Sequence, residues 1–309
     1  MRIVLIGLGV QGHKRRAIAG DSVIATVDPV SEGASHRSIE SVPLETYDAA
    51  LVCTPDEVKV ALLRYLLSHG KHVLVEKPLI AGSDTELEEL AVLAEDNGVT
   101  CYTAYNHRFE PHFVHMKALL DEGSLGHIYS VRMFYGNGTA RLVRQSPWRD
   151  KGAGVLMDLG SHLLDTCAFW FGSLDHRAAT LVSANRFENQ APDHCAFVFP
   201  GQPLLQLEMT LLSWRNHFYA DVHGEKGSAH IQSLCKWGPS IFTRRNRILP
   251  SGRPTEHSVT LVQDDPTWAL EYRHFLELTR TGTGNIRNDI LLNRTLRHLS
   301  RSAPMASPS

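Results

Sequence analysis

The chain has 309 residues, of which 43% are hydrophobic and 21% charged, with a formal net charge of −2. This composition fits a globular protein of about two domains, and the near-neutral charge leaves no basic excess to bind nucleic acid, so we expect no nucleic-acid partner. No apolar run reaches the roughly 18 residues that cross a bilayer, and the five cysteines are scattered without a CxxC pair, so we expect reduced thiols in the cytoplasm and no membrane partner.

The first hundred residues alternate β-rich runs with helical stretches. Strands are expected at 2–6, 23–28, 49–54, 72–75 and 99–104, and helices at 12–19 and 58–68. Ser83 and Glu86 form a capping-box pattern that begins a third helix, with Leu87, Leu90, Ala91 and Ala94 on one face. This alternation predicts an α/β fold whose parallel sheet is covered on both faces.

After residue 106 the pattern changes. A helix at 112–121 precedes strand-like runs at 128–135, 178–185, 194–199, 204–212, 218–224 and 227–232, with helices at 155–171, 268–280 and 288–300. Consecutive strands joined by short turns predict a C-terminal α+β domain with a large open, mainly antiparallel sheet. We therefore expect domains at 1–120 and 121–309. An open sheet needs a covered face, which predicts a homodimer or homotetramer.

A glycine motif, Gly7-Leu8-Gly9-Val10-Gln11-Gly12, follows the first strand and opens the first helix. In that context GxGxxG predicts a dinucleotide site, in which the backbone approaches the pyrophosphate and free helix N–H groups bind it. Asp28 ends the second strand, where a carboxylate binds ribose hydroxyls and repels a 2′-phosphate. The cofactor prediction is NAD. NADP stays an alternative, because Arg37 and the Lys14-Arg15-Arg16 cluster lie near in the chain.

Several motifs in order give the chain a resemblance to the Gfo/Idh/MocA oxidoreductases, the glucose–fructose oxidoreductase and inositol dehydrogenase group. They are the glycine loop, Glu76-Lys77-Pro78, the run from Tyr105 to Pro111, and the run from Gly152 to Asp165. The resemblance implies a Rossmann domain followed by a substrate domain with an open sheet. One departure is clear: the family often has a histidine four residues after the Thr-Pro pair, whereas Thr54-Pro55 is followed by Lys59.

Asp158 and His162 are four residues apart on an expected helix, so they share a face, and Asp165 lies close to it. Histidine suits a general acid/base because its reference pKa is near neutrality. The alternative is a surface ion pair, which contributes little. No further ligands accompany the pair, so we expect no metal.

The resemblance implies that Lys77, Asp158 and His162 are the catalytic residues and also bind the substrate. His162 would be the acid/base, Lys77 the partner of the reacting oxygen, and Asp158 the orienting group. It also implies cofactor contacts from Thr54, Pro55, Glu76, Lys77 and Asn106, beside Gly7, Gly9, Val10, Gln11, Gly12 and Asp28 of the loop.

A basic segment from Arg141 to Arg149 precedes the helix that carries Asp158. Its Arg144 and Trp148 are candidates for binding an anionic group of the substrate, and the alternative is a basic surface loop.

The expected function is NAD(P)-dependent hydride transfer at a secondary alcohol or ketone of a sugar, polyol or sugar derivative. Two alternatives use the same fold: a glycosidase-type enzyme that retains its NAD, and a non-catalytic NAD-binding regulator.

Overall fold

The computed structural model describes residues 1–146 and 149–302. Its internal contacts divide it into two compact units: Met1–Asn106 with Thr267–Asn293, and His107–Pro266 with the segment that begins at Arg294. The expected domain limits, 1–120 and 121–309, differ from these units in two ways. Helix α4 (Pro111–Asp121) belongs to the second unit, and the chain returns to the first unit after residue 266.

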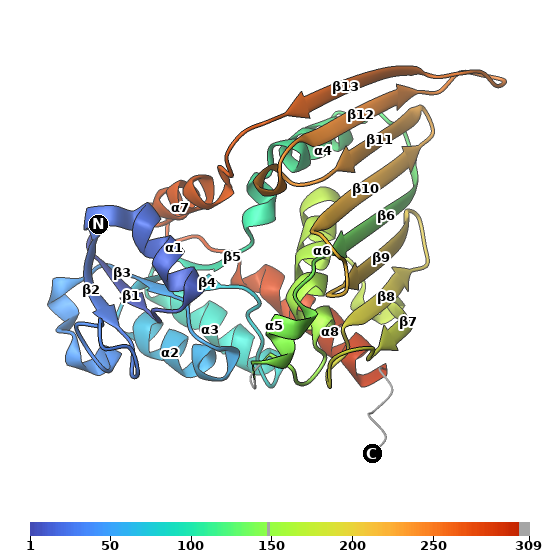
Figure 1. Ribbon diagram of the computed structural model, residues 1–309. Helices are drawn as coiled ribbons and strands as arrows, with labels where there is room; N and C mark the ends of the chain where they lie inside the picture. Colours follow the sequence, from blue (N-terminus) through green and yellow to red (C-terminus); the bar gives the residue numbers. More distant parts are fainter. Residues whose placement is uncertain (147–148, 303–309) are drawn as a thin grey trace. The chain divides into compact units, whose positions relative to one another are not determined.

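The first unit contains a five-stranded parallel sheet in the order β2-β1-β3-β4-β5 (Figure 1). Its strands are β1 (Ile3–Ile6), β2 (Val23–Val27), β3 (Ala49–Val52), β4 (His72–Glu76) and β5 (Cys101–Ala104). Its helices are α1 (Val10–Ala19), α2 (Asp56–Ser68), α3 (Asp84–Asp96), α7 (Thr267–Leu278) and the first part of α8 (Ile286–Ser302). Short 3-10 turns occupy Gly20–Ser22, Ile39–Ser41 and Leu44–Thr46. The expected strands and helices of this half are present, with small differences at their ends.

Two apolar layers hold this unit together, because successive side chains of a strand point to opposite faces. One layer contains Ile3, Leu5, Leu51 and Leu74 with Phe275 of α7, all buried. The other contains the alternate strand residues and packs them against α2, α3 and α8. Its members include Val4, Ile6, Ala50, Val52, Val73, Val75, Leu63, Leu66, Leu87, Leu90 and Ile290. The returning segment is therefore part of the core of the Rossmann sheet.

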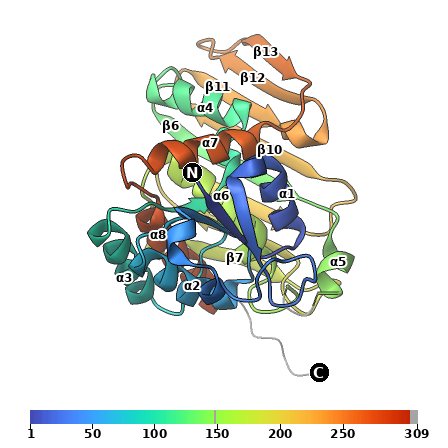
Figure 2. The ribbon, with the colours of Figure 1, turned by 90° about the vertical axis from the view of Figure 1, so that its left-hand side faces the viewer.

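A buried arginine joins α1 to the returning segment. Arg15 is 1% exposed, and its guanidinium pairs with Glu76 at 2.7 Å and with Glu271 of α7 at 2.6 Å. The Trp268 ring covers it at 4.3 Å, and Figures 1 and 2 show α1 and α7 side by side. Burial opposes the charged form, but the two carboxylates outweigh it and raise the pKa of Arg15. Both carboxylates thus share this one buried cation.

The second unit contains an eight-stranded sheet in the order β13-β12-β11-β10-β6-β9-β8-β7. All neighbours are antiparallel except β6 and β9, so the expected fold class is confirmed. The strands are β6 (Ile128–Gly136), β7 (Thr180–Asn185), β8 (His194–Phe199), β9 (Leu204–Thr210), β10 (His217–Gly224), β11 (Gly227–Gln232), β12 (Ser240–Asn246) and β13 (Thr255–Leu261). The last two strands and the short helix α5 (Ala140–Arg144) were not expected from the sequence.

Helix α6 (Val155–Phe171) packs against β6, β8 and β9 of this sheet, and α4 packs against β11 and β12 (Figure 1). Most residues of α6 are buried, and they include the polar residues Ser161, His162, Asp165 and Thr166. Three 3-10 turns complete the unit, at Asn106–Phe109, His176–Ala178 and Cys235–Trp237. Among the described helices, none has the length and hydropathy that a membrane span requires.

Replacing Arg15 tests the importance of its buried pairing. Arg15→Met leaves Glu76 and Glu271 buried without their cation, so we expect the free energy of unfolding to fall by about 3–5 kcal/mol. Urea unfolding of the full chain, followed by circular dichroism, measures the change. Arg16→Met is the matched control, because Arg16 is exposed on the same helix. Equal stability of the two variants would contradict the role assigned to Arg15.

Candidate functional site

The glycine loop has the shape that a dinucleotide site requires. Gly7 has φ +93°, and its N–H donates to the carbonyl of Val27 at 2.8 Å. A Cβ on Gly12 would lie 2.0 Å from the Gly7 carbonyl oxygen, so α1 can approach the loop only without a side chain there. A Cβ on Gly9 would meet nothing within 4 Å. Gly9 is the N-cap of α1 and offers no side-chain cap, which leaves the first N–H groups of α1 for a phosphate.

Asp28 ties the loop to the end of β2. Its Oδ2 accepts from the Leu8 N–H at 2.8 Å, and its Oδ1 accepts from the N–H groups of Val30 and Ser31 at 2.9 and 2.8 Å. Partial burial acts to raise the pKa of Asp28, but these amide hydrogen bonds outweigh it and lower the pKa. The carboxylate is therefore ionised at neutral pH and fixed in orientation. Val10 and Gln11, which follow Leu8 and Gly9 at the start of α1, are exposed.

The other expected cofactor residues stand at the carboxyl ends of the central strands. Thr54 and Pro55 join β3 to α2, and the Thr54 hydroxyl is buried without a hydrogen-bond partner in the described chain. Glu76 ends β4 and pairs with Arg15. Asn106 is 8% exposed, and its amide donates to Thr267 Oγ1 at 2.8 Å. Glu76 and Asn106 therefore each bind another residue of the protein, whether or not they also contact a cofactor.

Lys77 follows β4 directly, and the backbone on both sides of it is held by Lys59. The Lys59 ammonium donates to the Glu76 carbonyl at 2.6 Å, to the Pro78 carbonyl at 2.8 Å and to Asp56 Oδ1 at 2.7 Å. Lys59 is 2% exposed. Sequence reasoning recognised Lys59 only as a departure from the family pattern, and nothing in the spacing indicated this contact.

Asp158 and His162 lie on α6 in the second unit. His162 is 7% exposed, so the alternative of a simple surface ion pair is excluded. The Asp158 side chain is 36% exposed and pairs with Arg149 at 3.2 Å. Lys77 belongs to the first unit and Asp158 and His162 to the second, so the three expected catalytic residues come from both.

Three aromatic rings form a group with His162 in the second unit. The His107 ring stacks on His162 with centroids 4.0 Å apart, and Tyr135 lies 5.9 Å from His162. Trp237 lies 5.7 Å from Tyr135. Sequence reasoning missed Tyr135 and Trp237, because they come from β6 and from a turn after β11, far from α6 in the sequence.

Lys236 precedes Trp237 and places its ammonium beside the Trp237 ring. The Lys236 ammonium lies 4.9 Å from the centre of the Trp237 ring. Its side chain reaches the surface, yet the surrounding protein lowers its pKa by desolvation, against the opposing charges of Glu110, Asp265 and Asp158. The turn Cys235–Trp237 thereby adds a cation that interacts with Asp158 and an aromatic ring beside Tyr135.

Asp165 has a structural contact. It is 1% exposed, and Arg108 donates to it through Nε at 2.8 Å and Nη2 at 2.6 Å. This bidentate pair joins the Asn106–Phe109 turn to α6, and so explains why the motif containing Arg108 and the motif containing Asp165 occur together.

The basic segment from Arg141 to Arg149 follows β6 and precedes α6. Arg144 is exposed at the end of α5, which agrees with the alternative of a basic surface loop. Trp148 lies outside the described residues. Arg149, which the sequence analysis did not single out, is the member of this segment that pairs with Asp158.

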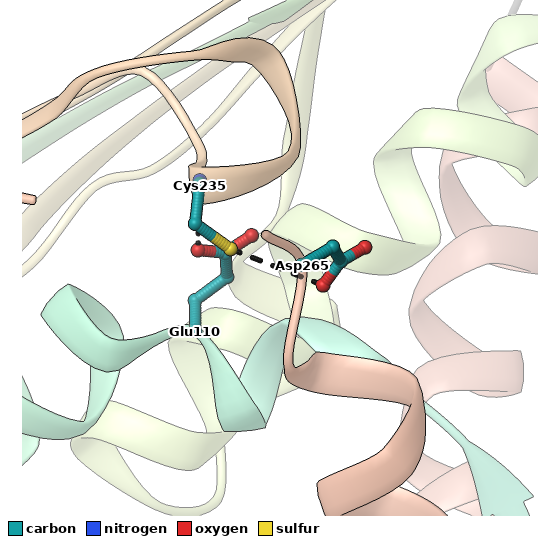
Figure 3. Close-up of side chains that lie close together, drawn as sticks. All are labelled: Glu110, Cys235 and Asp265. Atoms are coloured by element: carbon teal, nitrogen blue, oxygen red, sulfur yellow. Dashed lines mark hydrogen bonds between the residues drawn. The ribbon is translucent and has the colours of Figure 1, made fainter. Parts of the chain in front are cut away.

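Glu110, Cys235 and Asp265 bring three donor atoms within 4.8 Å of one another (Figure 3). The Cys235 N–H donates to Glu110 Oε2 at 3.2 Å, and its thiol lies 3.9 Å from Asp265 Oδ1. Burial raises the pKa of the Cys235 thiol and of Glu110. That opposes the anionic forms that a metal binds, and the Lys236 ammonium nearby repels a cation. We therefore interpret the cluster as support for the turn rather than as a metal centre.

Comparison with known families gives two matches of the same kind. Residues 13–105 match the family "Oxidoreductase family, NAD-binding Rossmann fold", and residues 113–230 match "GFO/IDH/MocA C-terminal domain". The resemblance and the NAD-binding fold expected from the sequence are thereby confirmed.

The relatives include dehydrogenases of cyclic polyols. The scyllo-inositol 2-dehydrogenase (NADP(+)) IolW of Bacillus subtilis is 33% identical over 128 residues, which are 40% of this chain and 35% of that protein. The inositol 2-dehydrogenase of Rhizobium meliloti is 24% identical over 260 residues, 81% of this chain and 76% of that protein. The match thus spans about a third of IolW and three quarters of the Rhizobium enzyme.

The fold also matches solved structures. Levoglucosan dehydrogenase in complex with NADH and levoglucosan superposes with a TM-score of 0.80 at 16% identity, covering 98% of both chains. An oxidoreductase from Desulfitobacterium hafniense, described as NADPH-dependent, gives a TM-score of 0.82 at 15% identity, covering 97% of this chain and 94% of that one. At these identities the likeness concerns the fold.

Two glycine substitutions separate the packing of the loop from its contact with the cofactor. Gly12→Ala places a methyl group against the Gly7 carbonyl, so both the thermal unfolding midpoint and the affinity for NADH are expected to fall. Gly9→Ala meets open space, so we expect an unchanged midpoint and weaker NADH binding. Calorimetry and NADH fluorescence titration measure the two effects.

Gly201→Ala is the control for the glycine substitutions, since a Cβ there also meets nothing within 4 Å. Wild-type NADH affinity in Gly9→Ala would show that the pyrophosphate does not approach this loop.

Proposed function

Because the chain belongs to the GFO/IDH/MocA oxidoreductase family, we propose that it transfers a hydride between nicotinamide and a secondary alcohol or ketone of a sugar, polyol or sugar derivative. The observation that carries the proposal is the buried imidazole of His162, one helical turn from Asp158 and beside the rings of His107 and Tyr135. Inositol dehydrogenases among the relatives support the class of substrate.

The proposed roles follow from the chemistry of alcohol oxidation. The nicotinamide accepts or supplies the hydride when bound. His162 takes the proton from the substrate hydroxyl, and returns it in the reverse direction. Lys77 donates a hydrogen bond to the reacting oxygen, and Asp158 accepts from a neighbouring hydroxyl. His107 fixes the plane of the His162 ring by stacking on it at 4.0 Å.

NAD is the proposed cofactor. Asp28 is held as a carboxylate by three amide hydrogen bonds, and a fixed negative charge at the end of β2 disfavours a 2′-phosphate. Gly7, Gly9, Val10, Gln11 and Gly12 would bind the pyrophosphate, and Thr54, Pro55, Glu76, Lys77 and Asn106 would line the rest of the cofactor. The buried Thr54 hydroxyl is a free group of the described chain that suits this role.

We also propose a cytoplasmic homodimer or homotetramer. The five cysteines are free thiols, as expected in a reducing compartment. Residues of β6 alternate between buried and more exposed positions, so one face of the eight-stranded sheet is available to a partner.

Hydride transfer to NAD or NADP, followed by absorbance of the reduced cofactor, tests the function on a panel of sugars, cyclic polyols and sugar acids. His162→Asn removes the acid/base, so we expect kcat to fall roughly 10²- to 10⁴-fold with NADH affinity unchanged. His127→Asn, at an exposed histidine of the same unit, serves as control. If His162→Asn turns over as fast as wild type, the acid/base assignment is wrong.

Asp28→Asn tests the preference between cofactors. Loss of the charge removes the repulsion of a 2′-phosphate, so the ratio of kcat/KM for NAD to that for NADP should fall roughly tenfold, equivalent to about 1.4 kcal/mol. Asp21→Asn, an exposed residue before β2, should leave the ratio unchanged. A constant ratio in Asp28→Asn would instead assign the selection to other residues.

A further inference from the structure

Lys59 is one of the most deeply buried charged residues of the first unit, at 2% exposure. It lies in the first turns of α2, and its ammonium makes three hydrogen bonds of 2.6 to 2.8 Å. A lysine ammonium has three N–H donors and no acceptor, so these contacts use its full capacity. An ammonium that is desolvated to this degree needs all of its partners.

The three acceptors of the Lys59 ammonium all lie close to Lys77 or on the helix of Lys59 itself. Two of them are the carbonyl oxygens of Glu76 and Pro78, the residues immediately before and after Lys77. The third, Asp56, supplies the counter-charge from the same helix at i−3. Lys59 therefore holds both peptide groups that flank Lys77 and leaves the Lys77 side chain outside the clamp.

The Glu76 side chain is fixed from another direction. Its carboxylate pairs with Arg15 at 2.7 Å, while its carbonyl accepts from Lys59. Backbone and side chain of the residue before Lys77 are thus held by two different buried cations. Such double restraint exceeds what the end of a β-strand needs for its own pairing, and it is directed at a single short segment.

We propose that Lys59 is a positioning residue, which sets the place of the Lys77 ammonium by clamping the Glu76 and Pro78 carbonyls. The inference rests on the proposed function for its catalytic consequence, but the clamp itself does not. Lys59 stands where the family often has a histidine, and an imidazole cannot donate to three acceptors at once.

The main experiment compares Lys59→Met with wild type in the full chain. Lys77 would lose its fixed position, and a displacement of about 1 Å can cost roughly 10²-fold in rate. We therefore expect kcat to fall by that order, with smaller changes in KM and NADH affinity, because Glu76 and Lys77 are also assigned to the lining of the cofactor and substrate sites. Lys59→His, which restores one donor, should recover part of the rate.

Lys71→Met is the matched control. Lys71 belongs to the same unit, and its ammonium also donates to two carbonyls, of Leu44 and Tyr47 at 2.8 and 3.0 Å. This variant loses comparable hydrogen bonds without touching the segment of Lys77. If kcat falls equally in Lys71→Met and Lys59→Met, the effect is general destabilisation and the proposal is overturned.

A second readout does not require turnover. The rate at which an amine reagent modifies Lys77 is measured by mass spectrometry, with exposed Lys226 as internal reference. Lys59→Met should change the relative rate for Lys77 several-fold and Lys71→Met should not. If wild type turns over no substrate, the proposed function fails, and this labelling alone decides the clamp. An unchanged Lys77 rate in Lys59→Met overturns it.

Discussion

A single buried guanidinium connects three parts of the chain that are far apart in sequence. Arg15 comes from the helix after the glycine loop, Glu76 from the end of β4, and Glu271 from the segment that returns after the second unit. A charge with 1% exposure is tolerated only because both carboxylates neutralise it. The positions of α1, β4 and α7 are therefore coupled. The glycine loop ends three residues before Arg15, and Lys77 directly follows Glu76.

Two buried cations hold the segment that contains Lys77. Arg15 binds the Glu76 side chain, and Lys59 binds the main chain on either side of Lys77. Neither cation is exposed, so both interactions are little screened by salt. The second unit has similar ion pairs. Arg108 pairs with Asp165 and so fixes α6, and Arg149 pairs with Asp158 of the same helix. In both units arginine or lysine fixes the elements that carry the expected catalytic residues.

The parts of the fold that could be predicted are those whose sequence pattern lies within one short stretch of the chain. The glycine loop, the apolar strands of the parallel sheet and the apolar helix α6 each have a pattern contained in one short stretch. Strands β12 and β13 were missed because their polar residues, such as Arg244, Arg245 and Glu256, leave no alternation of apolar side chains. The partners of Lys59 and the aromatic neighbours of His162 were missed for another reason. Most of these residues are far apart in the sequence and come into contact only when the chain is folded, so no spacing pattern in the sequence indicates the contact.

The return of the chain to the first unit also affects the order of events on the ribosome. All five strands of the parallel sheet have been synthesised by residue 104, yet Glu271 and the apolar side chain of Phe275 follow only after the whole second sheet. At elongation speeds of about 5–20 residues per second, the interval is roughly 10–30 s. During that time the nascent Rossmann sheet has one apolar face incompletely covered and Arg15 lacks one of its two anions. The first unit thus completes its folding only after Thr267–Asn293 has been synthesised, and so after the polypeptide that separates its two pieces.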